Sequence, residues 1–332
     1  GGVMEHIEEA GIHSGDSSCT LPPITLGPDI IAKVKDATEK IARGTGVRGL
    51  INIQFAYVSE NLYVIEANPR ASRTVPFVSK ATGVQLAKAA VLIGLGKTIA
   101  ELKAEGYLPQ HMDGASLPQE TAIAVKAAVL PFARFRTPEG VVVDSLLSPE
   151  MRSTGEVMGL DQHFDTAFAK AQAGAGSPMP TSGKVFISVA NHDKRNVIIY
   201  AKMLESLGFE IVSTGGTAEI LRRNGLNSIL VASKFAEANG DHSIVDMVRN
   251  GDIDLILNTP AGGAARSDGY EIRAAAVSVG CPVMTTISEF AAAVQAITAL
   301  REHSWDIMSL QEHDVKLAAA VDARLASEGG EA

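Results

Sequence analysis

The stretch that decides the fold of the first half of the chain is Ile51-Asn-Ile-Gln-Phe-Ala-Tyr-Val-Ser-Glu-Asn-Leu-Tyr-Val-Ile-Glu-Ala-Asn68. Two β-rich runs, 50–58 and 62–67, are joined by a short polar turn, which predicts a β-hairpin. A hairpin centred on Glu60 places Gln54 directly opposite Glu66, and Asn68 on the same face because side chains alternate along a strand. We expect the other face to be core and to contain Ile51, Ile53, Phe55, Tyr63 and Ile65.

One face of this hairpin therefore presents a carboxylate and two amides together. Oxygen ligands of this kind suit Mg²⁺, which takes one or two carboxylates and completes its shell with water and phosphate oxygens. Arg70 and Arg73 follow and carry guanidinium groups that bind phosphate or carboxylate through paired hydrogen bonds. A solvated hairpin face explains the same pattern, and from the residues alone both interpretations stay open.

Length and composition restrict the class of protein. The 332 residues correspond to two or three domains at about 100–200 residues each, and 46% hydrophobic with 20% charged residues is ordinary for a globular chain. The net charge is −9, without a long basic run, so we expect no nucleic-acid partner. The apolar stretches are short, so we expect no membrane partner.

The cysteines and the first residues concern the cellular context. Cys19 and Cys281 lie far apart and form no metal-binding pair, which indicates a reducing compartment and a cytoplasmic location. The chain starts Gly1-Gly-Val-Met-Glu-His-Ile, without the basic start and apolar core of a signal peptide. This start resembles the middle of a strand, so we expect the chain to be a fragment of a longer protein.

The second half of the chain has a regular pattern. A small-residue stretch at 173–183 marks a boundary, after which short apolar runs alternate with helical segments up to residue 300. This alternation predicts an α/β fold, a doubly wound parallel sheet with helices on both faces. The predicted strands are 184–189, 210–213, 229–231, 254–258 and 283–284, and the predicted helices are 194–207, 218–223, 244–249, 270–279 and 289–300.

Polar residues gather where these predicted strands end. Thr214 and Thr217 bracket a Gly-Gly turn at a helix N-terminus, where free N–H groups and the helix dipole favour an anion. Lys194 and Lys234 follow neighbouring strands and add positive charge, and Asn258 ends a further strand. An ordinary strand-to-helix turn with solvated lysines is the alternative interpretation.

Longer strings resemble a known family. Gly49-Leu-Ile-Asn-Ile-Gln-Phe-Ala, a turn, and Val64-Ile-Glu-Ala-Asn-Pro-Arg-Ala-Ser-Arg resemble the end of an ATP-grasp domain. The first 17 residues, together with Met151-Arg-Ser-Thr-Gly-Glu-Val-Met-Gly, resemble the second ATP-grasp half of carbamoyl phosphate synthase large chains. Biotin carboxylase and purine-pathway ATP-grasp ligases share the Gln, Glu and Asn that bind metal. We expect neither of them to be followed by a domain like the second half of this chain.

The resemblance implies roles for individual residues. ATP-binding residues are then Gly11, Ile12, His13, Ser14, Gln54 and Glu66. Two Mg²⁺ (or Mn²⁺) ions are held by Gln54, Glu66 and Asn68, and Arg70 and Arg73 act as catalytic residues on the carbamate or transferred phosphoryl group. Residues 1–95 become the C-terminal part of an ATP-grasp α+β domain, and residues 96–182 a connecting region.

Residues 183–332 resemble the methylglyoxal-synthase-like, Rossmann-like allosteric domain of these synthases. There the resemblance implies that UMP or a related nucleotide effector binds Lys194, Thr214, Thr217, Lys234 and Asn258. Two departures stand out: Pro260 replaces a Thr that helps hold the effector, and Ala127 replaces a Glu used by ornithine-activated members. Glu8, Asp16 and Thr285 match the other ornithine positions, so we expect ornithine activation to be weak or absent.

The expected function follows from the same resemblance. The parent protein is expected to be an ATP-dependent ligase that makes carbamoyl phosphate for pyrimidine and arginine synthesis, with ammonia from a glutaminase small chain and a possible homo-oligomeric assembly. A different class of function is a non-catalytic effector-binding module, the chain being inactive by itself. A true methylglyoxal synthase, with Asp241 as its carboxylate, is a further alternative that the residues around 260–268 do not favour.

Overall fold

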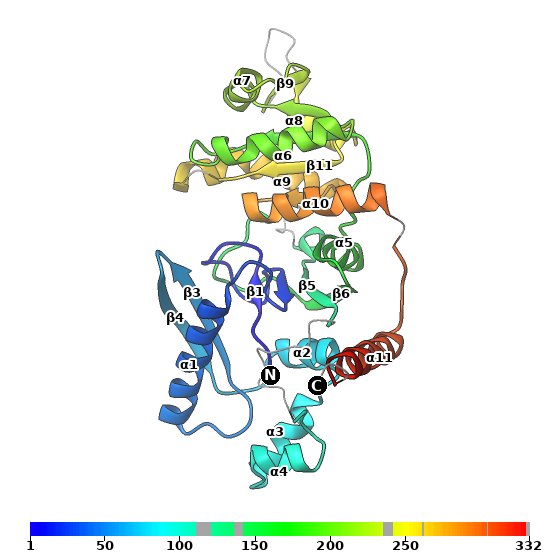
Figure 1. Cartoon of the computed structure of the whole chain (residues 1–332). Coiled ribbons are helices and arrows are strands. Elements are labelled where there is room, and N and C mark those ends of the chain that lie inside the picture. Colours follow the sequence, from blue (N-terminus) through cyan, green and yellow to red (C-terminus); the bar gives the residue numbers. More distant parts are fainter. Residues whose placement is uncertain (111–120, 136–141, 235–241, 261, 304, 330–332) are drawn as a thin grey trace.

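A computed structural model describes residues 1–110, 121–135, 142–234, 242–260, 262–303 and 305–329. It has an antiparallel part, formed by residues before 175, and a parallel α/β part that follows it (Figure 1). Two long helices, one from each part, lie between the two sheets. This arrangement confirms the mixed α/β class and the doubly wound second half that the sequence predicts.

The antiparallel part contains a four-stranded sheet in the order β1-β2-β5-β6. Its strands are β1 (Glu5–His6), β2 (Cys19–Leu21), β5 (Ile123–Val129) and β6 (Gly155–Asp161), and its helices are α2 (Thr74–Thr82), α3 (Leu86–Gly94), α4 (Ile99–Ala104) and α5 (Phe164–Gly174). Strand β5 pairs with β2 of the N-terminal segment, and β6 pairs with the other edge of β5. The sheet therefore joins strands from both sides of the boundary predicted at residue 95.

The predicted hairpin is present as β3 (Asn52–Val58) and β4 (Asn61–Asn68), next to α1 (Pro28–Thr45). The expectation that its apolar face is core is wrong: Tyr63 and Ile65 are 56% and 54% exposed. The hairpin is a two-stranded sheet by itself, and α1 has no buried residue. Within the described residues no element covers these side chains. A bulge next to Gln54 also moves Tyr63 opposite Ala56 and breaks the predicted alternation.

The parallel part has six strands in the order β10-β9-β8-β7-β11-β12. The strands are β7 (Lys184–Ser188), β8 (Glu210–Ser213), β9 (Ile229–Ser233), β10 (His242–Ser243), β11 (Leu255–Asn258) and β12 (Val283–Met284). The helices are α6 (Lys194–Ser206), α7 (Gly215–Arg223), α8 (Ile244–Arg249), α9 (Gly262–Val279) and α10 (Ile287–Glu302). All neighbouring strands are parallel, as the alternating pattern requires.

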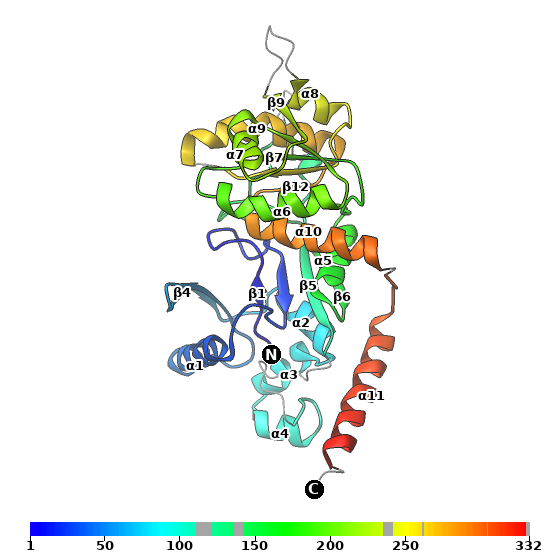
Figure 2. The same cartoon turned by 45° about the horizontal axis from the view of Figure 1, so that its top comes forward.

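Alternate residues of β7 point into two separate cores, as the strand period of two dictates. Val185 and Ile187 pack with α6, α7 and α10, whereas Phe186 packs with α8 and α9 on the other face. The first core does not end at α10, because it continues through Phe168 of α5 to Val125 of β5. Helices α5 and α10 therefore join the two sheets into one hydrophobic unit (Figure 2).

Helix α11 (Leu310–Gly329) runs back along the antiparallel part, with Asp314 beside Gly83 at the end of α2. No helix of the described residues combines the length and the apolar character needed to cross a membrane. Cys19 is buried, Cys281 is half-buried, and neither forms a disulfide.

Gly159 sets how closely α5 approaches β6. A Cβ atom at this position would collide with the backbone carbonyl of Ala167 and the backbone nitrogen of Ala171. Backbone atoms of a packed helix move only with the whole helix, which also contacts α10. A side chain at Gly159 therefore disturbs the helix that joins the two parts.

We expect Gly159→Ala to lower the free energy of unfolding, measured by urea denaturation, by about 2–3 kcal/mol because it overpacks this contact. Gly155→Ala is the matched control on the same strand, since its nearest neighbours are side-chain atoms of Val129 at 4.0 Å. The control should change the stability by less than about 0.5 kcal/mol. Equal effects of the two substitutions would contradict this role of Gly159.

Candidate functional site

The hairpin register places the predicted site residues on paired positions of β3 and β4. Gln54 pairs with Glu66, as predicted, and Asn52 pairs with Asn68. The turn consists of Ser59 and Glu60, both with positive φ, the geometry of a two-residue turn that matches the strand twist. The bulge beyond Gln54 absorbs the extra residue between this turn and the Gln54–Glu66 pair.

The two amides and the carboxylate converge, as the sequence predicts. Glu66 Oε1 accepts hydrogen bonds from Gln54 Nε2 at 2.6 Å and from Asn68 Nδ2 at 2.9 Å. Rotation about the terminal torsion of either amide presents its oxygen at the same place. One carboxylate and two amide oxygens fit a hard cation such as Mg²⁺ that keeps water and phosphate ligands. The described residues contain no cluster of three or more His, Cys, Asp or Glu side chains able to hold a metal ion, so this is not an all-protein cage.

The same hairpin touches the loop that contains Gly11, Ile12, His13 and Ser14. Gln54 Nε2 donates to Ser14 Oγ at 2.6 Å, and this hydrogen bond connects the two amides and the carboxylate of the hairpin to this loop. Within the loop, His13 Nδ1 accepts the N–H of Gly15 at 3.0 Å. Gly11 has a φ of +110°, which a residue with a side chain rarely adopts. The structure thus brings Ser14, Gln54 and Glu66 together.

Lys126 of β5 contacts this loop and was not among the predicted residues. Its side chain is fully buried in β5, and its ammonium donates to the carbonyl of Ser14 at 3.0 Å. Burial, and next the charge of Lys126, lower the pKa of His6 to about 4, so His6 is neutral at pH 7. A lysine within an apolar strand pattern is the sequence signal for such a residue, because buried charges need partners.

The two predicted arginines differ in their surroundings. Arg73 Nη2 donates to Ser153 Oγ at 2.7 Å and lies 3.1 Å from Met151 Sδ, beside Gly15. Arg70 is exposed, and its Nη1 donates to the carbonyl of Ala71 at 3.0 Å. Arg73 is therefore part of the loop assembly, whereas Arg70 lies at the edge of the hairpin site.

The second group of predicted residues lies at the carboxyl ends of four neighbouring strands, β9, β8, β7 and β11. Thr214 precedes α7 and its Oγ1 lies 3.2 Å from Ser188 Oγ. Asn258 Nδ2 donates to the carbonyl of Ser188 at 3.4 Å, and Thr217 Oγ1 accepts the N–H of Val189 at 3.4 Å. Ser188, which was not predicted, thus connects the ends of β7, β8 and β11.

The two lysines of this group have different environments. A Cβ atom on Gly216 would lie 3.5 Å from Lys194 Nζ, so this ammonium lies over the Gly-Gly turn at the start of α7. Lys234 Nζ lies 2.7 Å from Glu271 Oε2, and this contact lowers the pKa of Glu271. The turn with Lys194 above it is a cationic cradle at a helix N-terminus, the arrangement that favours a phosphate.

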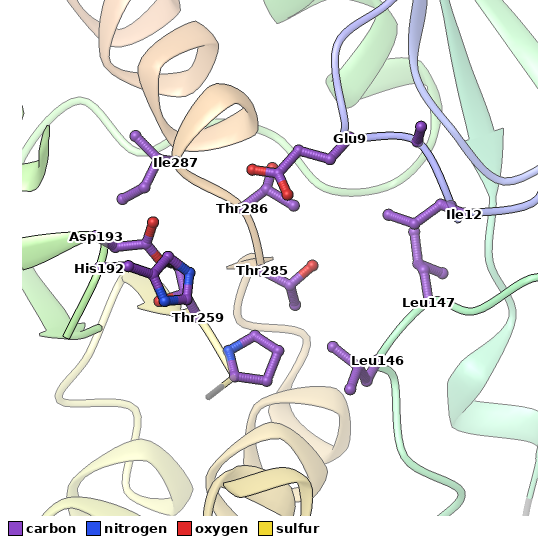
Figure 3. A pocket seen from close by; sticks show the side chains of 12 residues that line it. Glu9, Ile12, Leu146, Leu147, His192, Asp193, Thr259, Thr285, Thr286 and Ile287 are labelled. Atoms are coloured by element: carbon purple, nitrogen blue, oxygen red, sulfur yellow. Dashed lines mark ion pairs between the residues drawn. The ribbon is translucent and has the colours of Figure 1, made fainter. Parts of the chain in front are cut away.

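A cavity of about 180 Å³ separates the two sites. Figure 3 shows Glu9 and Ile12 of the N-terminal loop with Leu146 and Leu147 along one side, and parallel-part residues along the other. The latter are His192, Asp193, Thr259, Pro260, Thr285, Thr286 and Ile287. Thr259 Oγ1 accepts the N–H of Ala190 at 2.9 Å, so the hydroxyl next to Pro260 is already engaged.

A second cavity, of about 100 Å³, contains Glu8, Asp16, Ala127 and Glu289. Burial raises the pKa of Glu8 to about 7, and burial followed by the charge of Glu8 raises the pKa of Glu289 to about 8. Ser18 N donates to Glu8 Oε2 at 2.7 Å, and Thr285 N donates to Glu289 Oε2 at 3.1 Å. Asp241, the carboxylate of the methylglyoxal synthase alternative, lies outside the described residues.

Family models match both parts of the chain. Residues 2–102 match the "Carbamoyl-phosphate synthase L chain, ATP binding domain", and residues 196–285 match the "MGS-like domain". The first match contains the loop and the hairpin, and the second contains the Gly-Gly turn at α7 but begins two residues after Lys194. Both matches agree with the architecture of the part of the chain in which they lie.

Relatives cover nearly the whole chain. The carbamoyl phosphate synthase large chain of Kocuria rhizophila is 70% identical over 319 residues, that of Micrococcus luteus 66% over 324, and that of Streptomyces coelicolor 59% over 324. These alignments include 96%, 97% and 97% of this chain but 29% of each relative. The chain therefore belongs to the carbamoyl phosphate synthase large-chain family, with an ATP-binding domain of that family and an MGS-like domain.

Proposed function

We propose that this chain supplies the nucleotide end of the site that phosphorylates carbamate in a glutamine-dependent carbamoyl phosphate synthase. The observation that carries this proposal is the convergence of Gln54, Glu66 and Asn68 beside Ser14, inside the region that matches the ATP-binding domain. The substrates of the whole ligase are then ATP, bicarbonate and ammonia, and a glutaminase small chain delivers the ammonia.

The residues act mainly by positioning, which is most of what phosphoryl transfer requires. Gln54, Glu66 and Asn68 are assigned as ligands of two Mg²⁺ or Mn²⁺ ions, which neutralise phosphate charge when bound. Gly11, Ile12, His13 and Ser14 line the nucleotide pocket, and Lys126 holds this loop through the Ser14 carbonyl. Arg70 and Arg73 are assigned to the carbamate or the transferred phosphoryl group.

Binding without turnover is the second candidate function, and it concerns the 332-residue chain by itself. Glu66 is exposed on the hairpin surface, and no described residue covers it. Electrostatic stabilisation of a transferring phosphoryl group needs a site from which water is excluded. We therefore infer that the chain alone is a nucleotide-binding and regulatory module.

The isolated chain is expected to show no ATP hydrolysis above the rate of buffer in a coupled phosphate-release assay with Mg²⁺. Glu66→Gln and the turn variant Glu60→Gln should be indistinguishable from the unmodified chain. Robust hydrolysis that Glu66→Gln abolishes and Glu60→Gln preserves would refute the inference and show that the exposed triad is sufficient.

We also propose that the cradle at the strand ends binds a nucleotide monophosphate effector, UMP or a related one. Its phosphate lies over the N-terminus of α7, between Thr214 and Thr217, with Lys194 as the counter-charge. Asn258 and Lys234 complete the set at the neighbouring strand ends. Pro260 cannot supply the hydroxyl of the Thr that it replaces, which affects the choice of effector.

UMP should bind the 332-residue chain in isothermal calorimetry, and Lys194→Ala should weaken the affinity at least about tenfold, since a charge-assisted contact contributes about 1.5–3 kcal/mol. Lys202→Ala, on an exposed position of the same helix, is the control and should leave the affinity unchanged. IMP and ornithine are titrated in parallel. No heat with UMP, or equal affinity of the Lys194→Ala variant, would exclude the assigned site.

We propose that the cavity with Glu8 and Glu289 favours protonated carboxyl groups and does not hold the amino group of ornithine. Ala127 provides no carboxylate there, and both oxygens of Asp16 already accept the backbone N–H groups of Arg152 and Ser153, at 2.7 and 2.9 Å. The raised pKa values of Glu8 and Glu289 show that this environment favours the neutral acids.

This pair makes stability depend on pH. The folded chain keeps protons that the unfolded chain releases near pH 4.5, so the carboxyl pair becomes progressively destabilising as the pH rises from about 5 to about 8. Glu289→Gln removes one titrating group, so the stability of this variant relative to the unmodified chain should rise over that range. Urea denaturation at pH 5.5, 7.0 and 8.5 measures the difference.

Glu302→Gln, an exposed substitution on the same helix, is the control and should show the pH dependence of the unmodified chain. If Glu289→Gln and Glu302→Gln follow the same pH profile, the protonated pair is not a property of this cavity.

A further inference from the structure

Residues 142–153, here called the strap, cross from the effector-binding part to the nucleotide loop without forming a helix or a strand. At its start two side chains of α9 hold it. Tyr270 Oη donates to the carbonyl of Val142 at 2.6 Å, and Arg273 donates from Nε and Nη2 to the two oxygens of Asp144, both at 2.7 Å. Arg273 is fully buried and the Asp144 side chain is 30% exposed, so this paired contact is partly shielded from water.

Arg273 also reaches the effector site. Its Nη1 donates to Asn258 Oδ1 at 2.7 Å, and a guanidinium has no acceptor, so the atom of Asn258 that faces it is necessarily the oxygen. The amide nitrogen of Asn258 is therefore directed to the strand ends, where it meets the carbonyl of Ser188. Arg273 fixes which group Asn258 presents to a ligand.

The other end of the strap holds the nucleotide loop. The carbonyl of Ser148 accepts the N–H of His13 at 2.9 Å, and Asp16 accepts the N–H groups of Arg152 and Ser153. Ser153 Oγ donates to the carbonyl of Gly15 at 3.0 Å and accepts Arg73 Nη2 at 2.7 Å. The strap thus makes backbone contacts along the predicted nucleotide loop.

The middle of the strap lies at the cavity between the two parts. Leu146 and Leu147 form one wall of the cavity between the two parts, with Thr285 and Thr286 on another side (Figure 3). Leu146 N also donates to Asp144 Oδ1 at 3.1 Å, which stiffens the strap next to Arg273. Asp144 therefore contacts both Arg273 and the backbone of the middle of the strap.

We propose that the strap is the physical connection between the effector site and the nucleotide loop, and that Arg273 is the positioning residue that couples Asn258 to Asp144. The proposal rests on the proposed effector function of the cradle. A nucleotide that binds Asn258 restrains Arg273, Arg273 restrains Asp144, and the strap passes this restraint to the backbone around His13 and Asp16.

Hydrogen exchange of the 332-residue chain with and without saturating UMP tests the connection. In the unmodified chain UMP should slow exchange at least about threefold in residues 142–153 and in the loop 11–18. Asp144→Asn keeps the shape of the side chain but removes its charge, and should bind UMP within about threefold of the unmodified affinity while the loop loses its UMP-dependent protection. Retained protection in the loop would overturn the proposal.

Arg273 is tested with two variants. Arg273→Lys keeps the positive charge but not the paired N–H donors of the guanidinium. This variant should retain UMP binding, with a smaller UMP-dependent protection of the loop 11–18. Arg273→Met should weaken UMP binding about tenfold and abolish the response. Lys170→Met is the control, because Lys170 pairs with Asp161 at 2.7 Å in the antiparallel part, away from the strap contacts. If Lys170→Met also abolishes the response, general destabilisation is its cause and the proposal is wrong.

Failure of the effector assignment has a different signature. If UMP gives no binding heat with the unmodified chain, that assignment fails. Hydrogen exchange measured without nucleotide then tests whether Asp144 and the strap hold the nucleotide loop. Asp144→Asn alone should then speed exchange several-fold in residues 13–17 and leave β7 and α6 unchanged. Unchanged exchange in residues 13–17 would overturn the connection itself.

Discussion

The packing of α5 against α10 is the contact on which both sites depend. One hydrophobic core runs from Val125 in the antiparallel sheet through Phe168 of α5 and Phe290 of α10 to Ile187 in the parallel sheet. Two sheets that share a core of this kind do not move as independent domains, because close-packed interiors transmit displacement. The loop with Ser14 and the cradle over α7 are therefore attached to one shared core, and the strap 142–153 runs between them.

Buried charged groups determine where the irregular segments lie on this shared core. Lys126, Asp16 and Arg273 each bind groups that are distant in the sequence: the Ser14 carbonyl, the Arg152 and Ser153 amides, and Asp144 with Asn258. A buried charge that loses its partners is costly, so each of these contacts selects one placement of a loop that has no secondary structure of its own. The loop with Ser14 and the strap are thus held in place by buried charged side chains.

The two sites differ in how complete they are within the described residues. The cradle is surrounded by its own strand ends, with Ser188 at the centre and Lys234 paired to Glu271. The hairpin site has the converging amides and carboxylate but an exposed Glu66, and apolar side chains such as Tyr63 and Ile65 lie open beside it. This contrast supports effector binding by the 332-residue chain and a catalytic role only within a larger ligase.

The sequence by itself determined the local helices and strands. It also determined which polar side chains share one face of a strand, because side chains alternate along it. The pairing of Gln54 with Glu66, the alternation of β7, β8, β9, β11 and β12 with helices, and the Gly-Gly turn at α7 were predictable, because hairpin register and parallel βα units follow from short-range patterns. Strand β10 was not predicted. The exposed hairpin face and the bulge were not, since burial depends on which other elements pack against a strand. Only the tertiary structure decided that Lys126 lies under Ser14, that Arg273 joins Asn258 to Asp144, and that Glu8 faces a cavity with Glu289. These contacts bring together residues more than 100 positions apart in most cases, and neither the period of an element nor its capping residues restrict which distant groups a buried charge will meet.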